Sequence, residues 1–199
     1  MSWLSRLGYM GLSLRELDPY ILGEKRGKVF GITFDDGFCN VFENALPVLR
    51  SLGFSSTCFF VSGQIGGSNK WDETKGIRFE QCMSAEQIRS WANAGNEIGA
   101  HTVDHVNLTD CGIDEAFDQV YRSRMHLEEI SKERVTSFSY PYGGVSAAVR
   151  NVVARAGFKR AVTLEKAQAT SRNDSLLLPR RNVRHSDGWI AACRKTVLG

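Results

Sequence analysis

The chain has 199 residues, of which 42% are hydrophobic and 24% are charged, and its formal net charge at pH 7 is +3. This size and composition predict one globular domain with a sizeable core and exclude a disordered or fibrous protein. The mild positive charge comes without a dense run of lysine and arginine, so the sequence does not indicate a nucleic-acid groove.

The first 27 residues are expected to form an N-terminal extension that packs on a single domain made by residues 28–199. The extension lacks the sustained apolar stretch of a secretion signal, and no later stretch approaches the length that spans a membrane. We therefore expect a cytoplasmic protein without a membrane segment. The sequence leaves the oligomeric state open.

Strands and helices are predicted to alternate along the domain. The apolar run of residues 28–34 predicts a buried strand, and residues 41–52 carry apolar side chains at helical spacing before Gly53 offers a stop. Later strands are predicted at residues 57–61, 97–101, 137–140 and 160–163, and later helices at 84–95, 113–131 and 146–156. This order predicts an α/β fold with a mostly parallel sheet and barrel-like closure.

Two adjacent carboxylates, Asp35 and Asp36, follow the first predicted strand and precede Gly37. Neighbouring like charges disfavour joint ionisation unless a cation, a donor or water compensates them, so a metal ion is one explanation. A surface turn is the other, because Asp and Gly both suit turn geometry.

Two of the four histidines, His101 and His105, follow the predicted strand at residues 97–101. If this segment turns helically, the spacing of four places both imidazoles on one side, where they can share a metal. The alternative is that they hydrogen-bond the loop backbone. One carboxylate and two imidazoles leave coordination positions open, as in a catalytic metal site.

Three motifs occur in a fixed order: Thr33-Phe-Asp-Asp-Gly37, His101-Thr-Val-Asp-His105 and Tyr140-Pro-Tyr-Gly143. Together they resemble the polysaccharide deacetylase family, which has the NodB homology domain and is carbohydrate esterase family 4. The resemblance covers roughly residues 28–163. It implies a distorted (β/α) barrel, a NodB-like domain, and a hydrolase that removes N-acetyl groups from amino sugars of a polysaccharide or its precursor.

The resemblance also implies a role for each motif residue. A divalent metal, usually zinc, would be held by Asp36, His101 and His105, with Asp35 as the general base for a water activated by the cation. The backbone N–H of Tyr142 would stabilise the oxyanion, and the same segment is a rigid turn after a strand.

The chain departs from the family pattern at two places. Many members carry an arginine two residues before the proline of the third motif, where this chain has Ser139. Arg180 is our candidate to hold Asp35 instead, because a guanidinium can grip a carboxylate in two places; a solvated or structural arginine is the alternative. The usual late Leu-x-His segment is not evident either, so His185 becomes the candidate general acid, with an exposed loop side chain as its alternative.

Substrate contacts are predicted from aromatic residues and one long loop. Trp71, Tyr142 and Trp189 are candidate sugar platforms, with ordinary packing as the alternative. A closed pocket under the Gly-rich loop at residues 62–79 would favour a related amidohydrolase acting on a small non-sugar C–N bond, and an open groove would favour a polymer. A carbohydrate-binding protein without turnover is a third possibility.

Overall fold

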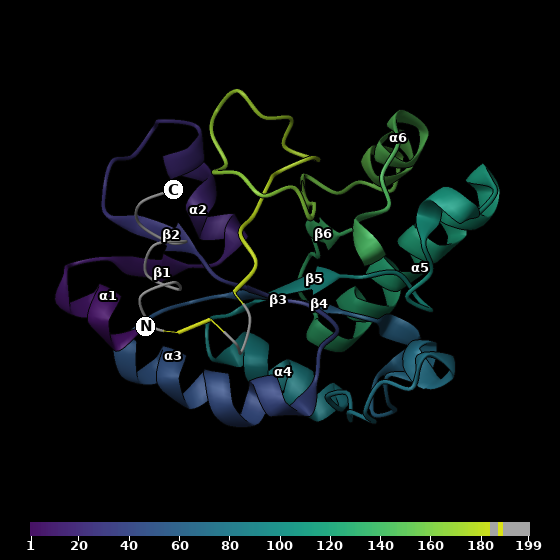
Figure 1. Cartoon of the computed structure of the whole chain (residues 1–199), viewed down its shortest axis with the longest axis horizontal. Helices are drawn as coiled ribbons and strands as arrows, with labels where there is room; N and C mark the ends of the chain where they lie inside the picture. Colours follow the sequence, from purple (N-terminus) through teal and green to yellow (C-terminus); the bar gives the residue numbers. More distant parts are fainter. Residues whose placement is uncertain (184–186, 189–199) are drawn as a thin grey trace.

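Five parallel strands form the central sheet of the computed structural model, which describes residues 1–183, 187 and 188. The strands lie in the order of the sequence and curl into a half-barrel, so the predicted α/β barrel-like fold is confirmed (Figure 1). They are β3 (Thr33–Phe34), β4 (Thr57–Phe60), β5 (Glu97–Ala100), β6 (Ser137–Ser139) and β7 (Arg160–Val162).

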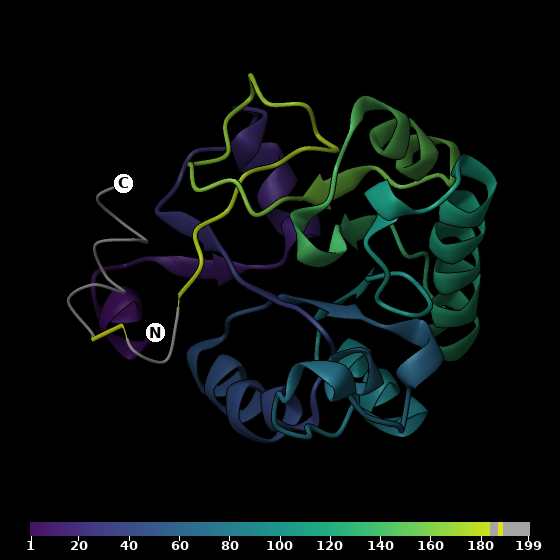
Figure 2. The same cartoon turned by 45° about the vertical axis from the view of Figure 1, so that its right-hand side comes forward.

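Four α-helices cover the outside of this sheet. Figures 1 and 2 show two of them below the sheet and the other two together on its right. They are, in order, α3 (Leu46–Leu52), α4 (Ala85–Asn93), α5 (Ile113–Ser131) and α6 (Ala147–Arg155). A capping box begins α4, since the side chains of Ser84 and Gln87 each accept from the other residue's backbone N–H. Over the described part of the chain, no helix combines the length and the apolarity that membrane crossing requires.

Single-turn helices fill several connections. They are η1 (Val41–Ala45), η2 (Ser62–Gln64), η3 (Lys70–Lys75), η4 (Leu108–Asp110) and η5 (Pro141–Gly143). The first is a π-helical turn, so the helix predicted over residues 41–52 is not one regular α-helix. Pro47 at the start of α3 has no N–H to donate to the carbonyl four residues earlier, which explains the change of helical form at this point.

The N-terminal segment carries a second, two-stranded sheet. It contains α1 (Ser2–Arg6), β1 (Met10–Leu12), α2 (Leu14–Ile21) and β2 (Val29–Gly31), and β1 pairs in parallel with β2. The prediction of one strand over residues 28–34 is wrong, because the chain changes partners at Ile32. Its N–H donates to Leu12 C=O (2.9 Å), whereas its C=O accepts from the N–H of Thr57 in β4 (2.9 Å).

Strand β4 is buried on both faces, as expected for a parallel sheet covered on both sides. Phe60 packs with Trp91 and Phe138 in the large core between sheet and helices. The neighbouring Phe59 belongs to a smaller cluster on the other face, which includes Leu14. Because strand side chains alternate between faces, the same four residues build both cores.

A buried carboxylate joins three strands and the start of α2. Glu97 is 3% exposed, and its Oε1 accepts from the Ser137 hydroxyl (2.6 Å). Its Oε2 accepts from the Thr57 hydroxyl (2.7 Å) and from the Arg15 backbone N–H (2.9 Å). This N–H lies in the first turn of α2, where the helix dipole favours a negative charge. Glu97 therefore anchors the N-terminal segment to the sheet.

Replacing Glu97 with Ala should lower the free energy of unfolding by about 3 kcal/mol or more, because three buried donors lose their acceptor. Urea denaturation followed by circular dichroism measures the change. Glu129→Ala, at an exposed position of α5, is the matched control and should alter stability by less than about 0.5 kcal/mol. Equal effects of the two substitutions would show that Glu97 is not an anchor.

Candidate active site and metal centre

The three sequence motifs meet at one end of the half-barrel. Asp35 and Asp36 follow β3, His101 follows β5, and the turn containing Tyr142 follows β6. These strands are parallel, so their carboxyl ends lie at the same edge of the sheet.

Asp36, His101 and His105 form the candidate metal centre. Each offers one ligand atom, and these atoms all lie within 4.8 Å of one another. Asp36 Oδ1 is 3.5 Å from His101 Nε2 and 3.3 Å from His105 Nε2. Ligand bonds of about 2 Å at tetrahedral angles separate two donor atoms by roughly 3.3 Å, so the two distances from Asp36 to the histidines are those of ligands around one small cation.

The two histidines converge for a different reason from the one that their spacing suggests. The segment between them is not helical, so the condition under which their spacing would bring them together is not met. Instead, Thr102 and His105 have positive φ angles of 65° and 57°. Left-handed backbone is costly for residues with a side chain and recurs at functional sites, and here it turns the second imidazole back toward the first.

His101 is held in the form that binds a metal. Its Nδ1–H donates to the backbone C=O of Ser139 (2.7 Å), which leaves the Nε2 lone pair facing Asp36. Burial lowers the pKa of His101, against the opposing effect of Asp35 and Asp36. A neutral imidazole with one nitrogen satisfied and the other directed at a carboxylate is a preformed ligand.

The turn after β3 separates the two adjacent carboxylates. Asp36 and Gly37 both have a φ of 72°, and a Cβ at Gly37 would lie only 2.4 Å from Phe60 Cδ1. Only glycine fits at this second position. With this turn, Asp36 faces the histidines while Asp35 faces Arg180.

Arg180 binds Asp35 through both terminal nitrogens of its guanidinium group. Nη1–H donates to Asp35 Oδ1 (2.8 Å) and Nη2–H to Oδ2 (2.5 Å). The remaining N–H groups donate to the Thr33 hydroxyl (3.1 Å), the Ser139 hydroxyl (2.9 Å) and the Thr163 C=O (3.1 Å). All five donors of the guanidinium are thus used, and Ser139, which departs from the family pattern noted above, accepts one of them.

This contact controls the charge of Asp35. Burial alone would raise the pKa of Asp35, but the charge and hydrogen bonds of Arg180, with smaller contributions from His101 and His105, bring it below its ordinary value. Asp35 is therefore ionised at neutral pH and fixed in orientation.

The turn that contains Tyr142 borders the site beside His105. Tyr142 has a φ of 58°, and the Gly143 N–H closes the turn on Tyr140 C=O (3.0 Å). The Tyr142 ring packs edge-on against His105, with the ring centroids 4.6 Å apart. The side chain is 47% exposed, so it lies at the rim.

Trp71, a candidate sugar platform, lies against the candidate metal centre. Its ring stacks on His105 (centroids 4.7 Å apart) and on Phe38 (6.2 Å). These contacts are those of the packing alternative, and a role of Trp71 as a sugar platform stays a prediction. The other two residues predicted near substrate, His185 and Trp189, lie outside the described residues.

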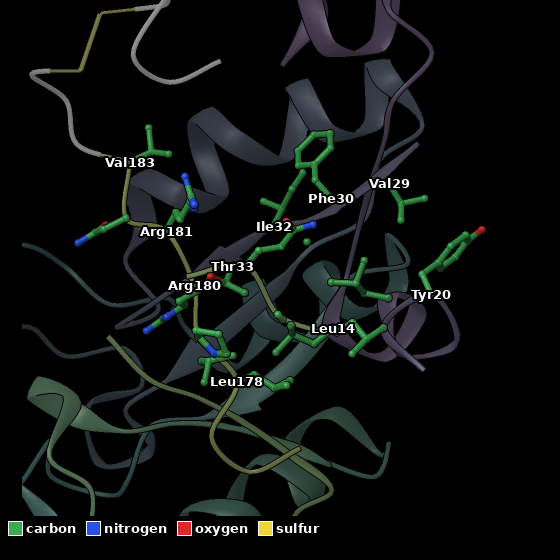
Figure 3. Close-up of a pocket in the computed structure, with 18 of the residues that line it drawn as sticks. Leu14, Tyr20, Val29, Phe30, Ile32, Thr33, Leu178, Arg180, Arg181 and Val183 are labelled. Carbon is green, nitrogen blue, oxygen red and sulfur yellow. Dashed lines mark hydrogen bonds between the residues drawn. The ribbon is translucent and has the colours of Figure 1, made fainter. Parts of the chain in front are cut away.

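A cavity of about 1210 Å³ is lined in part by Asp35 and Arg180; Figure 3 shows its lining around Arg180. Residues of α2, β2 and the segment around Leu178 line it, while none of the three candidate metal ligands does. Asp35, the neighbour of the candidate ligand Asp36, does line it, so the cavity borders the candidate base without reaching the ligands.

Several contacts of the site were not predicted from the sequence. Thr33 and Thr163 orient Arg180, and Phe38 stacks on Trp71, which itself stacks on His105. Thr33 carried a usable signal, because it opens the first motif and precedes Asp35 by two, and residues two apart in a strand point to the same side. Thr163 and Phe38 lie just outside the strands, where periodicity does not place a side chain.

Comparisons with known proteins agree with the motifs. The sequence profile described as polysaccharide deacetylase matches residues 22–161. The chain is 24% identical over 193 residues to the poly-β-1,6-N-acetyl-D-glucosamine N-deacetylase of Staphylococcus aureus, covering 90% of this chain and 63% of the relative. It is 28% identical over 172 residues to YxkH of Bacillus subtilis, whose name places it among polysaccharide deacetylases, covering 85% and 57%. The chain thus spans less than two thirds of each relative.

Solved structures share the fold. IcaB from Ammonifex degensii superposes with a TM-score of 0.83 at 25% identity, covering 98% of this chain and 84% of that one. The deacetylase PplD of Streptococcus pyogenes, solved in complex with acetate, gives 0.82 at 21% identity, covering 96% and 81%. Both similarities extend over nearly the whole chain.

Arg180→Gln should destabilise the metal-free protein by about 2 kcal/mol at pH 7, because the partly buried Asp35 carboxylate loses its counter-ion. A carboxyl with a lowered folded pKa contributes stability above its unfolded pKa and loses it as the pH falls through the folded value. The difference between wild type and variant should therefore narrow below about pH 4.

Urea denaturation from pH 3 to 7 in a chelating buffer measures this difference. Arg181→Gln, at the exposed neighbouring position, is the control and should follow the wild type at every pH. A loss of stability in Arg180→Gln that does not change with pH would contradict the ion-pair explanation.

Proposed function

Since the chain belongs to the polysaccharide deacetylase family, we propose that it hydrolyses N-acetyl groups on amino sugars of a polysaccharide or its precursor. The observation that carries this proposal is the Asp36, His101 and His105 cluster beside a carboxylate that Arg180 holds ionised. A candidate base lies next to a candidate metal centre, as metal-assisted hydrolysis requires.

We propose that Asp36, His101 and His105 hold a divalent metal, with zinc the best fit. Two imidazoles and one carboxylate form a donor set that zinc prefers, and three protein ligands leave room for a water and a substrate. The bound ion would polarise the acetyl carbonyl and lower the pKa of the attacking water.

Asp35 is proposed as the general base. Hydrolysis transfers the oxygen of water to the acetyl carbon, breaks the C–N bond and releases acetate and the sugar amine. Asp35 would accept a proton from the water, for which it must be ionised, and the contact with Arg180 keeps it so. Because a lowered pKa also makes Asp35 a weaker base, the scheme requires a water that is itself acidified.

Two steps remain, stabilisation of the oxyanion and protonation of the departing amine, and they are assigned to Tyr142 and His185. The backbone N–H of Tyr142 is proposed to donate to the developing oxyanion, a role supported by a turn that is fixed before charge develops. The departing amine needs a proton, and we propose His185 as its source, because imidazole titrates near neutral pH.

The proposed substrate is a polymer of N-acetylglucosamine. The name of the Staphylococcus aureus relative specifies such a polymer. Exposure at the rim supports a polymer over a small ring compound, since the side chains of Asp36 and Tyr142 are 25% and 47% exposed. A residue within a long chain can reach such a site without entering a closed pocket.

The wild-type protein loaded with zinc should release acetate from N-acetylglucosamine oligomers, and Asp35→Asn should reduce the rate at least about 100-fold, because an amide cannot accept the proton. An enzyme-coupled acetate assay measures both. Asp118→Asn, on the exposed face of α5, is the control and should retain the wild-type rate.

Removing metal with a chelator should abolish acetate release from the wild type, and adding zinc should restore it. The metal content of each sample is measured alongside the rate. Turnover that survives either metal removal or the Asp35 substitution would exclude the proposed mechanism.

A further inference from the structure

The two candidate histidine ligands are supported in different ways. His101 donates its Nδ1–H to a backbone carbonyl, the usual means by which a ligating imidazole is oriented. His105 Nδ1 is buried and has no hydrogen-bond partner among the residues that the structure describes. Apart from the approach of its Nε2 to Asp36, the described contacts of His105 are made by its ring.

Aromatic rings surround His105 in place of that hydrogen bond. Trp71 stacks on the imidazole with an interplanar angle of 29° and a centroid distance of 4.7 Å. Phe38 stacks behind Trp71 at 6.2 Å, and Tyr142 meets His105 edge-on at 4.6 Å. Trp71 thus stacks with both a candidate ligand and a second aromatic ring, and a rotation of His105 would break its stack with Trp71.

The loop that carries Trp71 is closed at its base. Residues Ser68 and Gln81 form an antiparallel bridge. Beside it, the Asn69 side chain donates to Arg78 C=O (3.0 Å) and accepts from the Glu80 N–H (2.8 Å). Asn69 is buried, so these bonds are shielded from water. The loop therefore presents Trp71 from a fixed base.

The far end of the same helical turn contacts the third motif. Lys75 Nζ donates to the Tyr142 hydroxyl (2.9 Å) and to Asp72 Oδ1 (3.1 Å). One short segment, η3, thus contacts both a candidate metal ligand and the turn proposed to bind the oxyanion. Its contacts converge on His105 from two sides.

We propose that Trp71 is a positioning residue for the metal ligand His105, replacing by ring stacking the hydrogen bond that orients His101. The inference rests on the proposed metal site. It carries a reciprocal consequence: if the η3 loop increases metal affinity, bound metal must stabilise the loop by the same free energy.

The test measures zinc affinity directly, by competition with a chromophoric chelator. Trp71→Leu fills much of the volume but removes the ring, and should weaken zinc binding about 10-fold. Trp71→Phe retains a ring for stacking and should stay within about threefold of wild type. Phe79→Ala, at a 70% exposed position of the same loop, is the matched control and should bind like wild type.

Two further measurements separate positioning from a general loss of folding. Asn69→Ala leaves every ring in place but releases the base of the loop, and should also weaken zinc binding. The Trp71→Leu protein substituted with Co²⁺ should show an altered visible absorption spectrum, while its far-ultraviolet circular dichroism stays that of the wild type.

The outcomes distinguish this inference from the proposed function. Wild-type protein that binds no zinc would overturn the metal site and the proposed mechanism together. Wild-type protein that binds zinc, with a Trp71→Leu variant of unchanged affinity and unchanged Co²⁺ spectrum, would overturn only the role of Trp71.

Discussion

The bond between Arg180 and Asp35 is the interaction on which the site depends. The guanidinium reaches residues from both sides of the half-barrel: Thr33 and Asp35 at β3, Ser139 at the end of β6 and Thr163 after β7. Because its five donors are rigidly arranged in one plane, it can be satisfied only when these strand ends lie at the correct separation. At the other end of the sheet, Glu97 similarly joins β4, β5 and β6. A positively charged side chain thus joins strands at one end of the sheet, and a negatively charged side chain joins strands at the other end.

The two adjacent aspartates have separate surroundings, which resolves the repulsion expected between them. Asp35 is neutralised by Arg180, whereas Asp36 faces two imidazoles that are suited to share a cation with it. The left-handed backbone at Asp36 makes this division possible, since an extended continuation would not turn the chain at this point. The two carboxylates can therefore be compensated by different neighbours only because the backbone turn first separates them.

The sequence predicted the repeating part of the fold well, because strands and helices there follow apolar periodicity. The limits of α5 agree with the prediction residue for residue. The prediction from sequence failed where the backbone of a single residue determines the structure. Ile32 hydrogen-bonds to strands of two different sheets, and the chain turns at His105 through a positive φ that residue spacing cannot reveal. Arg180 was predicted because a guanidinium can bind a carboxylate in two places. The stacking of Trp71 was not predicted, because it depends on a loop whose closure leaves no periodic pattern in the sequence.

The left-handed residues have a consequence for protein engineering. Among the described residues, five other than glycine have a positive φ, and Asp36, Thr102, His105 and Tyr142 are four of them. Each such conformation costs on the order of 1 kcal/mol, so the site is a concentrated source of local instability. Selection for thermal stability alone would favour relaxing these turns and would tend to erase the site. Stabilised variants should therefore be sought on the outer helices, where added stability and the geometry of the site do not compete.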